Sequence, residues 1–301
     1  METFDCVIIG AGPAGLQAAQ ILGRARRKVV VIDGGEPRNA PAAAMHGVLG
    51  HDGADPAEFL ARGRKELEKY NITVVRDEVR NVTKSLTVVF SQDKVKARTL
   101  IVATGVTDEL PEVPGLSQGW GDTVLHCPYC HAYEHAGQRL GVLGTGEDST
   151  PLALMMHQWS DDVTYFAAGA RIHPQDREVM EGRGMTIVDE EVLAFQNGQV
   201  LLGGADPVEV DALFVSPTFR PQDSFLDNLH LDRVDLPHGL GNVLAVDAAG
   251  QTSDPRIWAV GNVTNPSATV PVAIGAGATA GGLANAYLNS QDWLAFSATL
   301  A

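Results

Sequence analysis

The sequence predicts an α/β protein made of two nucleotide-binding domains of related fold. The first observation is a succession of strand, glycine turn, helix and strand at the N-terminus. The second is that this succession begins again about 130 residues later, which indicates a duplicated unit rather than a short repeat. The third is the length of 301 residues, which suits two domains with separate cores.

The first unit carries a dinucleotide-binding pattern. Gly10 allows a tight turn after the first strand, Gly12 lets the backbone approach a pyrophosphate, and Gly15 lets the helix pack closely on the strand. The second strand ends at Asp33, where an acidic side chain binds a ribose hydroxyl. The flanking elements are strands at 4–9 and 29–32 and a helix at 14–22. The pattern therefore predicts a bound dinucleotide.

The segment between the two units reads as a helix followed by strands. Asp55 is expected to cap a helix that has Pro56 at its first position and ends near Tyr70. Short strands are expected at 72–75, 87–90 and 100–103, and the last runs into Ala103, Thr104 and Gly105.

The second unit differs from the first in its charges. A strand at 140–143 leads into a turn at Gly144 and Gly146, and a helix at 150–158 and a strand at 163–166 follow. Glu147 and Asp148 lie in this turn, where their carboxylates would repel a pyrophosphate. The second strand is followed by small residues, and Arg171 is the first cation after it.

The C-terminal part predicts a turn, a short strand and a third glycine turn over 252–262, and then a helix over 272–288. Each glycine in a helix costs about 1 kcal/mol relative to alanine, so we expect this helix to pack closely against a flat surface. The glycines are Gly275, Gly277, Gly281 and Gly282.

Composition narrows the classes of function. The 37 acidic and 22 basic residues give a net charge of -15, which disfavours nucleic acid as a partner. The one basic cluster, 24–28, is interpreted as a solvated helix end. No apolar run reaches the length of a membrane span and no signal segment is recognised, so we expect a soluble, cytoplasmic protein without a membrane partner.

Cys127 and Cys130 form a Cys-Pro-Tyr-Cys motif in the middle of the chain. In a reducing compartment such a pair is more often catalytic or metal-binding than structural. A zinc site would need two further ligands, and no second pair or nearby histidine pair supplies them. A glutaredoxin-type site and a structural disulfide remain as alternatives for this pair. The third cysteine, Cys6, lies in the first strand and is interpreted as a small buried hydrophobic residue.

Taken in order, the first glycine turn, the cysteine pair, the second glycine turn and the 252–262 segment resemble the low-molecular-weight thioredoxin reductase family of flavoproteins. The resemblance covers essentially the whole chain. It implies two Rossmann-like, three-layer ββα domains and a homodimer. An FAD domain would comprise residues 1–113 plus 243–301, and an inserted pyridine-nucleotide-type domain at 116–240 would carry the cysteine pair.

Within that family, residues 38–40, 45–50 and 127–131 are most similar to the branch of gliotoxin- and holomycin-type dithiol oxidases. The first glycine turn and the resemblance together imply a set of residues that contact FAD. They are Gly10, Gly12, Pro13, Ala14, Gly15, Asp33, Gly34, Arg38, Asn39, His46, Ala103, Thr104, Gly105, Gly261, Asn262, Val272 and Ala273. No metal is expected.

Two departures from the family pattern bear on the cofactors. NADPH-binding reductases carry a cluster of arginines at the position where this chain offers Arg171 alone, so NADPH binding is disfavoured. Asn262 replaces an aspartate that binds the ribityl chain of FAD in the family. Because an amide oxygen still accepts a hydrogen bond from a hydroxyl, we retain FAD as the expected cofactor.

The expected chemistry is thiol and disulfide exchange. A helix N-terminus at the pair would favour a thiolate, the reactive form of cysteine. The resemblance implies that Cys130 faces the isoalloxazine ring and that Cys127 exchanges with an external sulfur. His131 is the candidate acid and base, and His126 is a weaker candidate for which a hydrogen-bonded surface position is the simpler interpretation.

Three hypotheses follow. The first is an FAD-dependent dithiol oxidase that converts a small or peptidic dithiol into a disulfide and passes the electrons to oxygen or another acceptor. The second is an NADPH-dependent reductase of the thioredoxin reductase type, which acts on a thioredoxin-like protein and assembles a basic cleft from Arg171 with Arg177 or Arg183. The third is a non-enzymatic flavin redox sensor.

Overall fold

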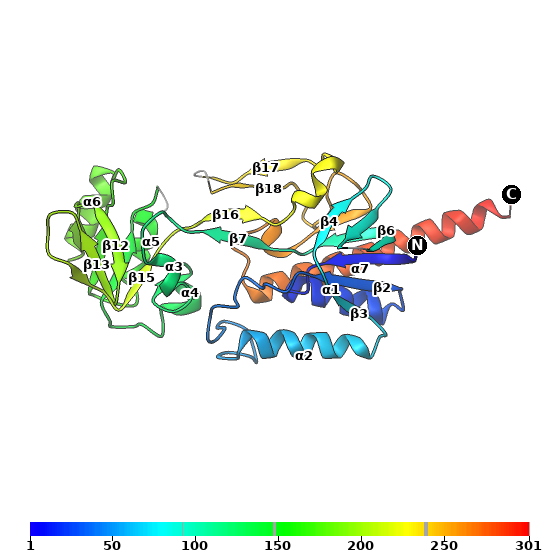
Figure 1. Cartoon of the computed structure of the whole chain (residues 1–301), viewed down its shortest axis with the longest axis horizontal. Coiled ribbons are helices and arrows are strands. Elements are labelled where there is room, and N and C mark those ends of the chain that lie inside the picture. The colour runs from blue at the N-terminus through cyan, green and yellow to red at the C-terminus, as the bar shows by residue number, and fades with distance from the viewer. Residues whose placement is uncertain (92, 147–148, 238–239, 301) are drawn as a thin grey trace.

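The computed structural model describes residues 1–91, 93–146, 149–237 and 240–300. The molecule is elongated, with a larger parallel-sheet unit and a smaller one at opposite ends (Figure 1). Strands β7 (Val106–Glu109) and β16 (Thr218–Pro221) run between them as an antiparallel pair. The predicted α/β class with two parallel-sheet units is therefore confirmed.

The larger sheet has the order β3-β2-β1-β6-β5-β4. Strand β19 pairs with the second half of β6, on the edge opposite β1. Its strands are β1 (Thr3–Ile9), β2 (Val29–Asp33), β3 (Thr73–Arg76), β4 (Val79–Val82), β5 (Thr87–Phe90), β6 (Asp93–Val102) and β19 (Ile257–Ala259). Strand β6 is longer than expected because its first half pairs with β5 in an antiparallel hairpin and its second half pairs in parallel with β1.

Helices α1 (Pro13–Arg24) and α7 (Val270–Ala298) pack against each other on one face of this sheet. Glycine is required where they touch, since a Cβ at Gly277 would lie 2.1 Å from the Ala14 carbonyl oxygen and one at Gly281 would lie 2.9 Å from that of Ala18. Gly275 and Gly282 face open space instead. Gly277 and Gly281 thus explain the close packing of α7. The surface on which α7 packs is helix α1, not the flat surface that was expected.

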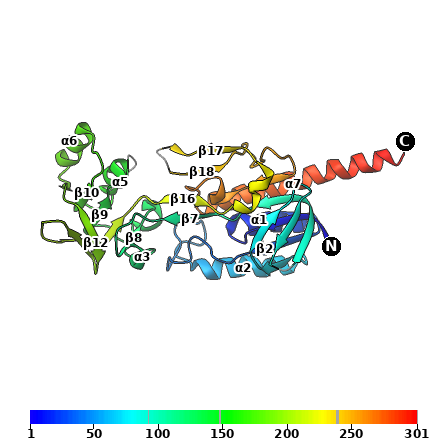
Figure 2. The same ribbon diagram turned by 45° about the horizontal axis from the view of Figure 1, so that its top comes forward.

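Helix α7 is also longer than the 272–288 expected, and its last turns project beyond the rest of the molecule in both views (Figures 1 and 2). Helix α2 (Pro56–Glu68) begins as predicted, with the Asp55 carboxylate accepting hydrogen bonds from the backbone nitrogens of Ala57 and Glu58.

The interpretation of residues 24–28 as a solvated helix end is wrong for Arg27. The Arg27 side chain is only 12% exposed and its guanidinium donates to Asn285, Asn289 and Asp292 of α7. The error arose because the contact depends on a helix more than 250 residues away in the sequence, as the separations of 258 to 265 residues show.

The smaller unit holds a five-stranded parallel sheet in the order β11-β10-β9-β15-β8. Its strands are β8 (Val124–Leu125), β9 (Leu140–Leu143), β10 (Val163–Phe166), β11 (Thr186–Val188) and β15 (Ala212–Phe214). Strands β12 (Val192–Gln196), β13 (Gln199–Leu202) and β14 (Val208–Glu209) form a separate antiparallel sheet. The helices of this part are α3 (Leu116–Gly119), α4 (Pro128–His131), α5 (Ser149–Met156) and α6 (Pro174–Gly182).

The chain returns to the larger unit directly after β16. Leu226, in the 3-10 helix η1 (Ser224–Leu229), is buried in the same apolar cluster as Val88 of β5 and Ile257 of β19. Strands β17 (Arg233–Asp235) and β18 (Asn242–Leu244) then pair as a hairpin. We therefore propose that the inserted domain ends near residue 221 rather than at 240, because burial of Leu226 assigns residues 224–229 to the larger core.

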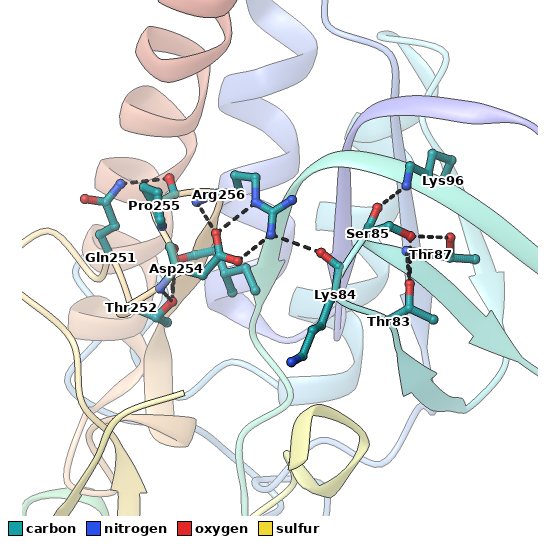
Figure 3. Close-up of polar contacts among 11 residues, drawn as sticks. Thr83, Lys84, Ser85, Thr87, Lys96, Gln251, Thr252, Asp254, Pro255 and Arg256 are labelled. Carbon is teal, nitrogen blue, oxygen red and sulfur yellow. Dashed lines mark hydrogen bonds and ion pairs between the residues drawn. The ribbon is translucent and has the colours of Figure 1, made fainter. Parts of the chain in front are cut away.

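The segment before β19 is fastened to the first sheet by polar contacts (Figure 3). The Arg256 guanidinium donates to Asp254 and to the backbone oxygen of Lys84, which lies in the turn between β4 and β5. The backbone oxygen of Arg256 accepts a hydrogen bond from Leu100 at 2.9 Å. These contacts hold β19 in the larger sheet, and they thereby place the third glycine turn beside the first glycine turn.

Candidate active site

A cavity of about 950 Å³ lies where the first glycine turn, the connecting strands and the cysteine segment meet. Most of the sequence-predicted site residues line it. They are Gly10, Gly12, Pro13, Ala14, Asp33, Gly34, Arg38, Asn39, His46, Ala103, Thr104, Gly105, Cys127, Cys130, His131, Gly261, Asn262 and Ala273. Gly15 and Val272 do not line it, and Val272 is an exposed residue on the outer side of α7.

The first glycine turn combines close packing with open space. Gly10 has φ +100°, and a Cβ there would lie 2.4 Å from the Ala103 carbonyl oxygen, whereas a Cβ at Gly15 would meet the Gly10 oxygen at 1.9 Å. Gly12 precedes α1 and has no neighbour within 4 Å of an added Cβ. In the described part of the chain no side chain caps α1, so its first amides remain available to an anion.

Asp33 and Thr104 supply polar groups to the same cavity. Oδ1 of Asp33 accepts a hydrogen bond from the Ala11 nitrogen at 2.8 Å, and Oδ2 lies 3.3 Å from Arg64. Thr104 Oγ1 is buried and has no hydrogen-bond partner among the described residues, which is costly unless a bound group supplies one. The glycine cradle, the acid and this orphaned hydroxyl together fit a dinucleotide such as FAD.

Arg38 connects the cavity to the two connecting strands. Its guanidinium donates to both carboxylate oxygens of Asp108, at 2.8 and 2.6 Å, and to the backbone oxygen of Pro266. It also lies over the ring of Phe219, 5.2 Å from the centroid. Asp108 of β7 and Phe219 of β16 are paired residues across the two strands. The guanidinium of Arg38 thus donates its hydrogen bonds to Asp108 and Pro266, and the side chain stabilises one wall of the cavity.

Asn262 lies at the third glycine turn, where Nδ2 donates to the backbone oxygens of Asn265, Pro266 and Ala268 at 3.1, 3.1 and 2.9 Å. An aspartate cannot donate these bonds, and its charge would repel the three oxygens. The amide therefore shapes the loop that borders the cavity. Its oxygen is the atom left to accept a hydrogen bond from a ligand.

Cys127 and Cys130 form a disulfide, with their Cα atoms 5.3 Å apart. Cys127 precedes the single turn of α4 in an extended conformation, and Pro128 occupies the first helical position. Both cysteines are half-buried and line the cavity. Cys6, by contrast, is a free thiol in the core whose burial raises its pKa to about 12, which leaves it unreactive.

Two histidines flank the cysteine pair. Burial and then the positive charge of Arg38 lower the pKa of His126 to about 4, so this ring is neutral near pH 7. Its Nε2 lies 3.4 Å from Nη2 of Arg38, and the ring stacks on Trp120. His126 is therefore a buried part of the site rather than the surface residue that the sequence favoured. Its position beside Cys127 was the sequence signal for a role in the site, whereas its burial results from tertiary folding.

Burial also lowers the pKa of His131, and the charge of Glu134 opposes that shift. Glu134 follows α4 in the chain and was not recognised from the sequence. His131 lines the cavity together with Cys130, which is compatible with its expected role as an acid and base.

A smaller cavity of about 340 Å³ lies at the second glycine turn. Ser149 Oγ accepts hydrogen bonds from the nitrogens of Thr145 and Gly146, at 2.9 and 3.3 Å, so these amides already have a partner within the protein. Among the residues that the structure describes, no charged side chain lines this cavity. Glu147 and Asp148 lie outside the described residues.

The arginines proposed for a basic cleft do not line the smaller cavity. Arg171 and Arg183 are exposed, and Arg177 pairs with Asp189, with Nη1 and Oδ2 3.1 Å apart. Arg177 is therefore already neutralised by an acidic neighbour.

Comparison with known proteins gives the family. Residues 4–277 match the pyridine nucleotide-disulphide oxidoreductase family. The chain belongs to this family. As a pyridine nucleotide-disulphide oxidoreductase it is an enzyme, and it is a flavoprotein of the thioredoxin reductase-like type.

Similar proteins include thioredoxin reductase sirT of Leptosphaeria maculans, 30% identical with coverage of 98% of this chain and 97% of the relative. Thioredoxin reductase aclD of Aspergillus oryzae is 39% identical over 55% of this chain and 57% of its own length. The crystal structure of HlmI is 38% identical and has a TM-score of 0.93, with coverage of 99% and 98%. The resemblance inferred from the sequence is thus confirmed. Among the described residues, no helix has the length and apolar character needed to cross a membrane.

Proposed function

We propose that this disulfide oxidoreductase oxidises a small or peptidic dithiol to a disulfide, with Cys127 and Cys130 as the redox pair and FAD as the cofactor. The observation that supports electron flow from a thiol to the flavin, rather than from NADPH, is the second glycine turn, which Ser149 caps. The amides of Thr145 and Gly146 bind Ser149, and no cation among the described residues lines the smaller cavity, so a pyridine nucleotide finds neither of its usual phosphate partners in this part of the described chain.

The residues of the larger cavity would divide the chemistry among them. The first amides of α1 would bind the pyrophosphate, Asp33 would accept a hydrogen bond from a ribose hydroxyl, and the Asn262 oxygen would accept one from the ribityl chain. The bound flavin would take up the two electrons and pass them to oxygen or another acceptor. Cys127 would exchange with the substrate sulfur and Cys130 would face the flavin, while His131 removes the proton of the substrate thiol.

Anaerobic absorbance spectroscopy of the purified holoprotein tests this function. Titration with dithiothreitol, a simple dithiol, should bleach the flavin, whereas NADPH and NADH should not do so on the time scale of turnover. Cys127→Ser and Cys130→Ser should each abolish bleaching by the dithiol, and Cys6→Ala, a change of the buried third cysteine, should leave it intact. Rapid bleaching by NADPH would instead identify an NADPH-dependent reductase.

We also propose that the enzyme is a homodimer formed through the outer face of α7. Residues 270–291 contain no charged side chain in a chain of net charge -15, so two copies can approach there without repulsion. Gly275, Thr279 and Gly282 are exposed small residues on this helix, and Trp293 and Phe296 of its projecting end are exposed as well.

Sedimentation analysis checks the dimer. Gly282→Arg introduces a charge where the structure has open space, so the monomer should fold and the dimer should dissociate. Gly182→Arg, at the end of α6, also enters open space and serves as the matched control, which should remain dimeric. A wild-type protein that sediments as a monomer would exclude the dimer.

A further inference from the structure

We propose that Tyr129 determines the specificity of the site, and that its ring is the surface on which an uncharged dithiol with a flat, ring-bearing carbon frame lies while it reacts with the cysteine pair. This inference rests on the proposed thiol-oxidising function and deepens it, because it names the class of the substrate.

Tyr129 is an exposed aromatic residue beside the reacting sulfurs. It lies between Cys127 and Cys130 in the chain and lines the same cavity as they do, yet it is 71% exposed. Helix α4, which carries it, lies on the side of the smaller unit that faces the larger one (Figure 1). An aromatic ring that is exposed to water at this place gains free energy when a substrate covers it.

The ring of Tyr129 is oriented by a neighbour in the smaller unit. Its centroid lies 6.0 Å from that of Trp159, and the two ring planes are nearly perpendicular, at 83°. Trp159 in turn packs against the apolar cluster that contains Tyr165 and Phe214. Because the ring is positioned before a substrate arrives, less conformational entropy is lost when the substrate binds.

The other aromatic residues that line this cavity already have partners in the protein. Trp120 stacks on His126, and a guanidinium lies over the ring of Phe219. Phe225 packs against the apolar cluster of the larger unit. Among the described residues, Tyr129 is therefore the aromatic ring of the cavity that offers an uncovered surface to a ligand.

The charges of the cavity favour an uncharged substrate. Among the described residues, three arginines and no lysine line it, and each arginine is paired with a carboxylate of the protein. The pairs are Arg38 with Asp108, Arg64 with Asp33, and Arg220 with Glu109. Two exposed acids, Asp52 and Glu134, each lie 3.5 Å from a ring nitrogen of His46, which also lines the cavity. A carboxylate on the substrate would therefore meet negative charges without an unpaired arginine or lysine to bind it.

Tyr133 provides a matched comparison in the same segment. It follows α4, is 78% exposed and does not line the cavity. An effect of exposed aromatic surface alone would be the same at Tyr129 and Tyr133. An effect at Tyr129 only is expected from contact with a substrate inside the cavity.

The test uses two uncharged dithiols that both close to a six-membered cyclic disulfide. Dithiothreitol has no aromatic ring, whereas ortho-benzenedimethanethiol has one. The measured quantity is the second-order rate constant of anaerobic flavin reduction by the aromatic dithiol, divided by that for dithiothreitol. Tyr129→Ala should lower this ratio about tenfold, which corresponds to about 1.4 kcal/mol. Tyr129→Phe, which keeps the ring, and Tyr133→Ala should each change it less than about twofold.

The second measurement is independent of turnover. Isothermal titration calorimetry of the oxidised holoprotein with the cyclic disulfide of ortho-benzenedimethanethiol should show about tenfold weaker binding to Tyr129→Ala than to the wild type. Equal losses at Tyr129 and Tyr133, or an unchanged ratio and unchanged binding in Tyr129→Ala, would overturn the role of Tyr129. If no dithiol bleaches the wild-type flavin, the proposed function is wrong, and the calorimetry still reports on Tyr129.

Two further probes test the class of substrate. Dihydrolipoamide and dihydrolipoate share one dithiol frame and differ in charge, and the uncharged amide should reduce the wild-type flavin about threefold faster. A preference for the acid would overturn the assignment of an uncharged substrate. Faster flavin reduction by reduced thioredoxin than by any small dithiol, at a rate that Tyr129→Ala leaves unchanged, would overturn the proposal in favour of a protein substrate.

Discussion

The seven-stranded sheet and the five-stranded sheet each carry a glycine turn at the carboxyl end of one strand, and the amides of the two turns have different partners. At the first turn the N-terminus of α1 is uncapped within the described residues, and Gly12 faces open space in the larger cavity. At the second turn Ser149 Oγ accepts from Thr145 and Gly146. Two copies of one local pattern have thus come to offer opposite environments to a phosphate.

The difference extends to the charges around each turn. The larger cavity is lined by Asp33, Arg38 and three histidines, whereas no charged side chain among the described residues lines the smaller one. A duplicated fold therefore does not imply a duplicated ligand. The groups that decide binding are side chains contributed from outside the turn.

The largest expected effect comes from placing a valine in each turn. Gly12→Val fills the space where the backbone meets the pyrophosphate, so the purified protein should retain less than about a tenth of the wild-type flavin. Gly146→Val enters equally open space in the second turn and should retain the full flavin content. Flavin absorbance per protein measures both. Equal losses in the two variants would show that the turns are equivalent.

The next prediction compares the loss of stability when a buried ion pair at the larger cavity is broken with the loss when an exposed ion pair of the smaller unit is broken. Arg38→Ala leaves Asp108, whose side chain is 4% exposed, without its partner and should lower the free energy of unfolding by about 3 kcal/mol. Arg177→Ala breaks the exposed pair with Asp189 and should cost less than about 1 kcal/mol. Urea unfolding followed by circular dichroism gives both values. A similar cost for the two variants would contradict the assigned difference in burial.

A third prediction uses the buried histidine of the first site. The unfolded chain binds a proton at His126 near pH 6.5 and the folded chain only near pH 4, so acid favours unfolding within that window. Between pH 7.5 and 5 the wild type should lose about 2 kcal/mol through His126. His126→Gln should lose correspondingly less in the same unfolding experiment. If both proteins respond equally to acid, His126 is not the group responsible.

The smallest effect is expected from removing the cap of the second turn. Ser149 is fully buried, so Ser149→Ala leaves two amides without a partner and should lower the free energy of unfolding by about 1 kcal/mol. Because no lining cation replaces the cap, the flavin of this variant should remain unbleached by NADPH. An unchanged urea midpoint would show that the cap contributes nothing.

Local patterns accounted for most of the fold. The spacing of glycines and apolar residues predicted β1, α1, β2, β9 and β10 to within two residues, because each depends on a short stretch of chain. The end of α7 beyond residue 288 was missed, since Asn289 and Asp292 there are bound by Arg27 and Arg98, which are distant in sequence.

The candidate site was predictable in its parts but not in its connections. Cys127, Cys130 and Asp33 could be found from motifs. The pairing of Arg38 with Asp108, 70 residues apart, and its contact with His126, 88 residues apart, arise from tertiary folding alone. The same holds for Glu134, whose partner His46 comes from another part of the fold.

The amide of Asn262 has a consequence for the ageing of the protein. Spontaneous deamidation would convert it into an aspartate and replace a donor to three backbone oxygens by a negative charge. A stored sample would then release flavin as the modified fraction, measured by mass spectrometry, increases. A carboxylate at this position would therefore shorten the shelf life of the protein, and Asn262→Asp should reproduce the loss of flavin in a fresh sample.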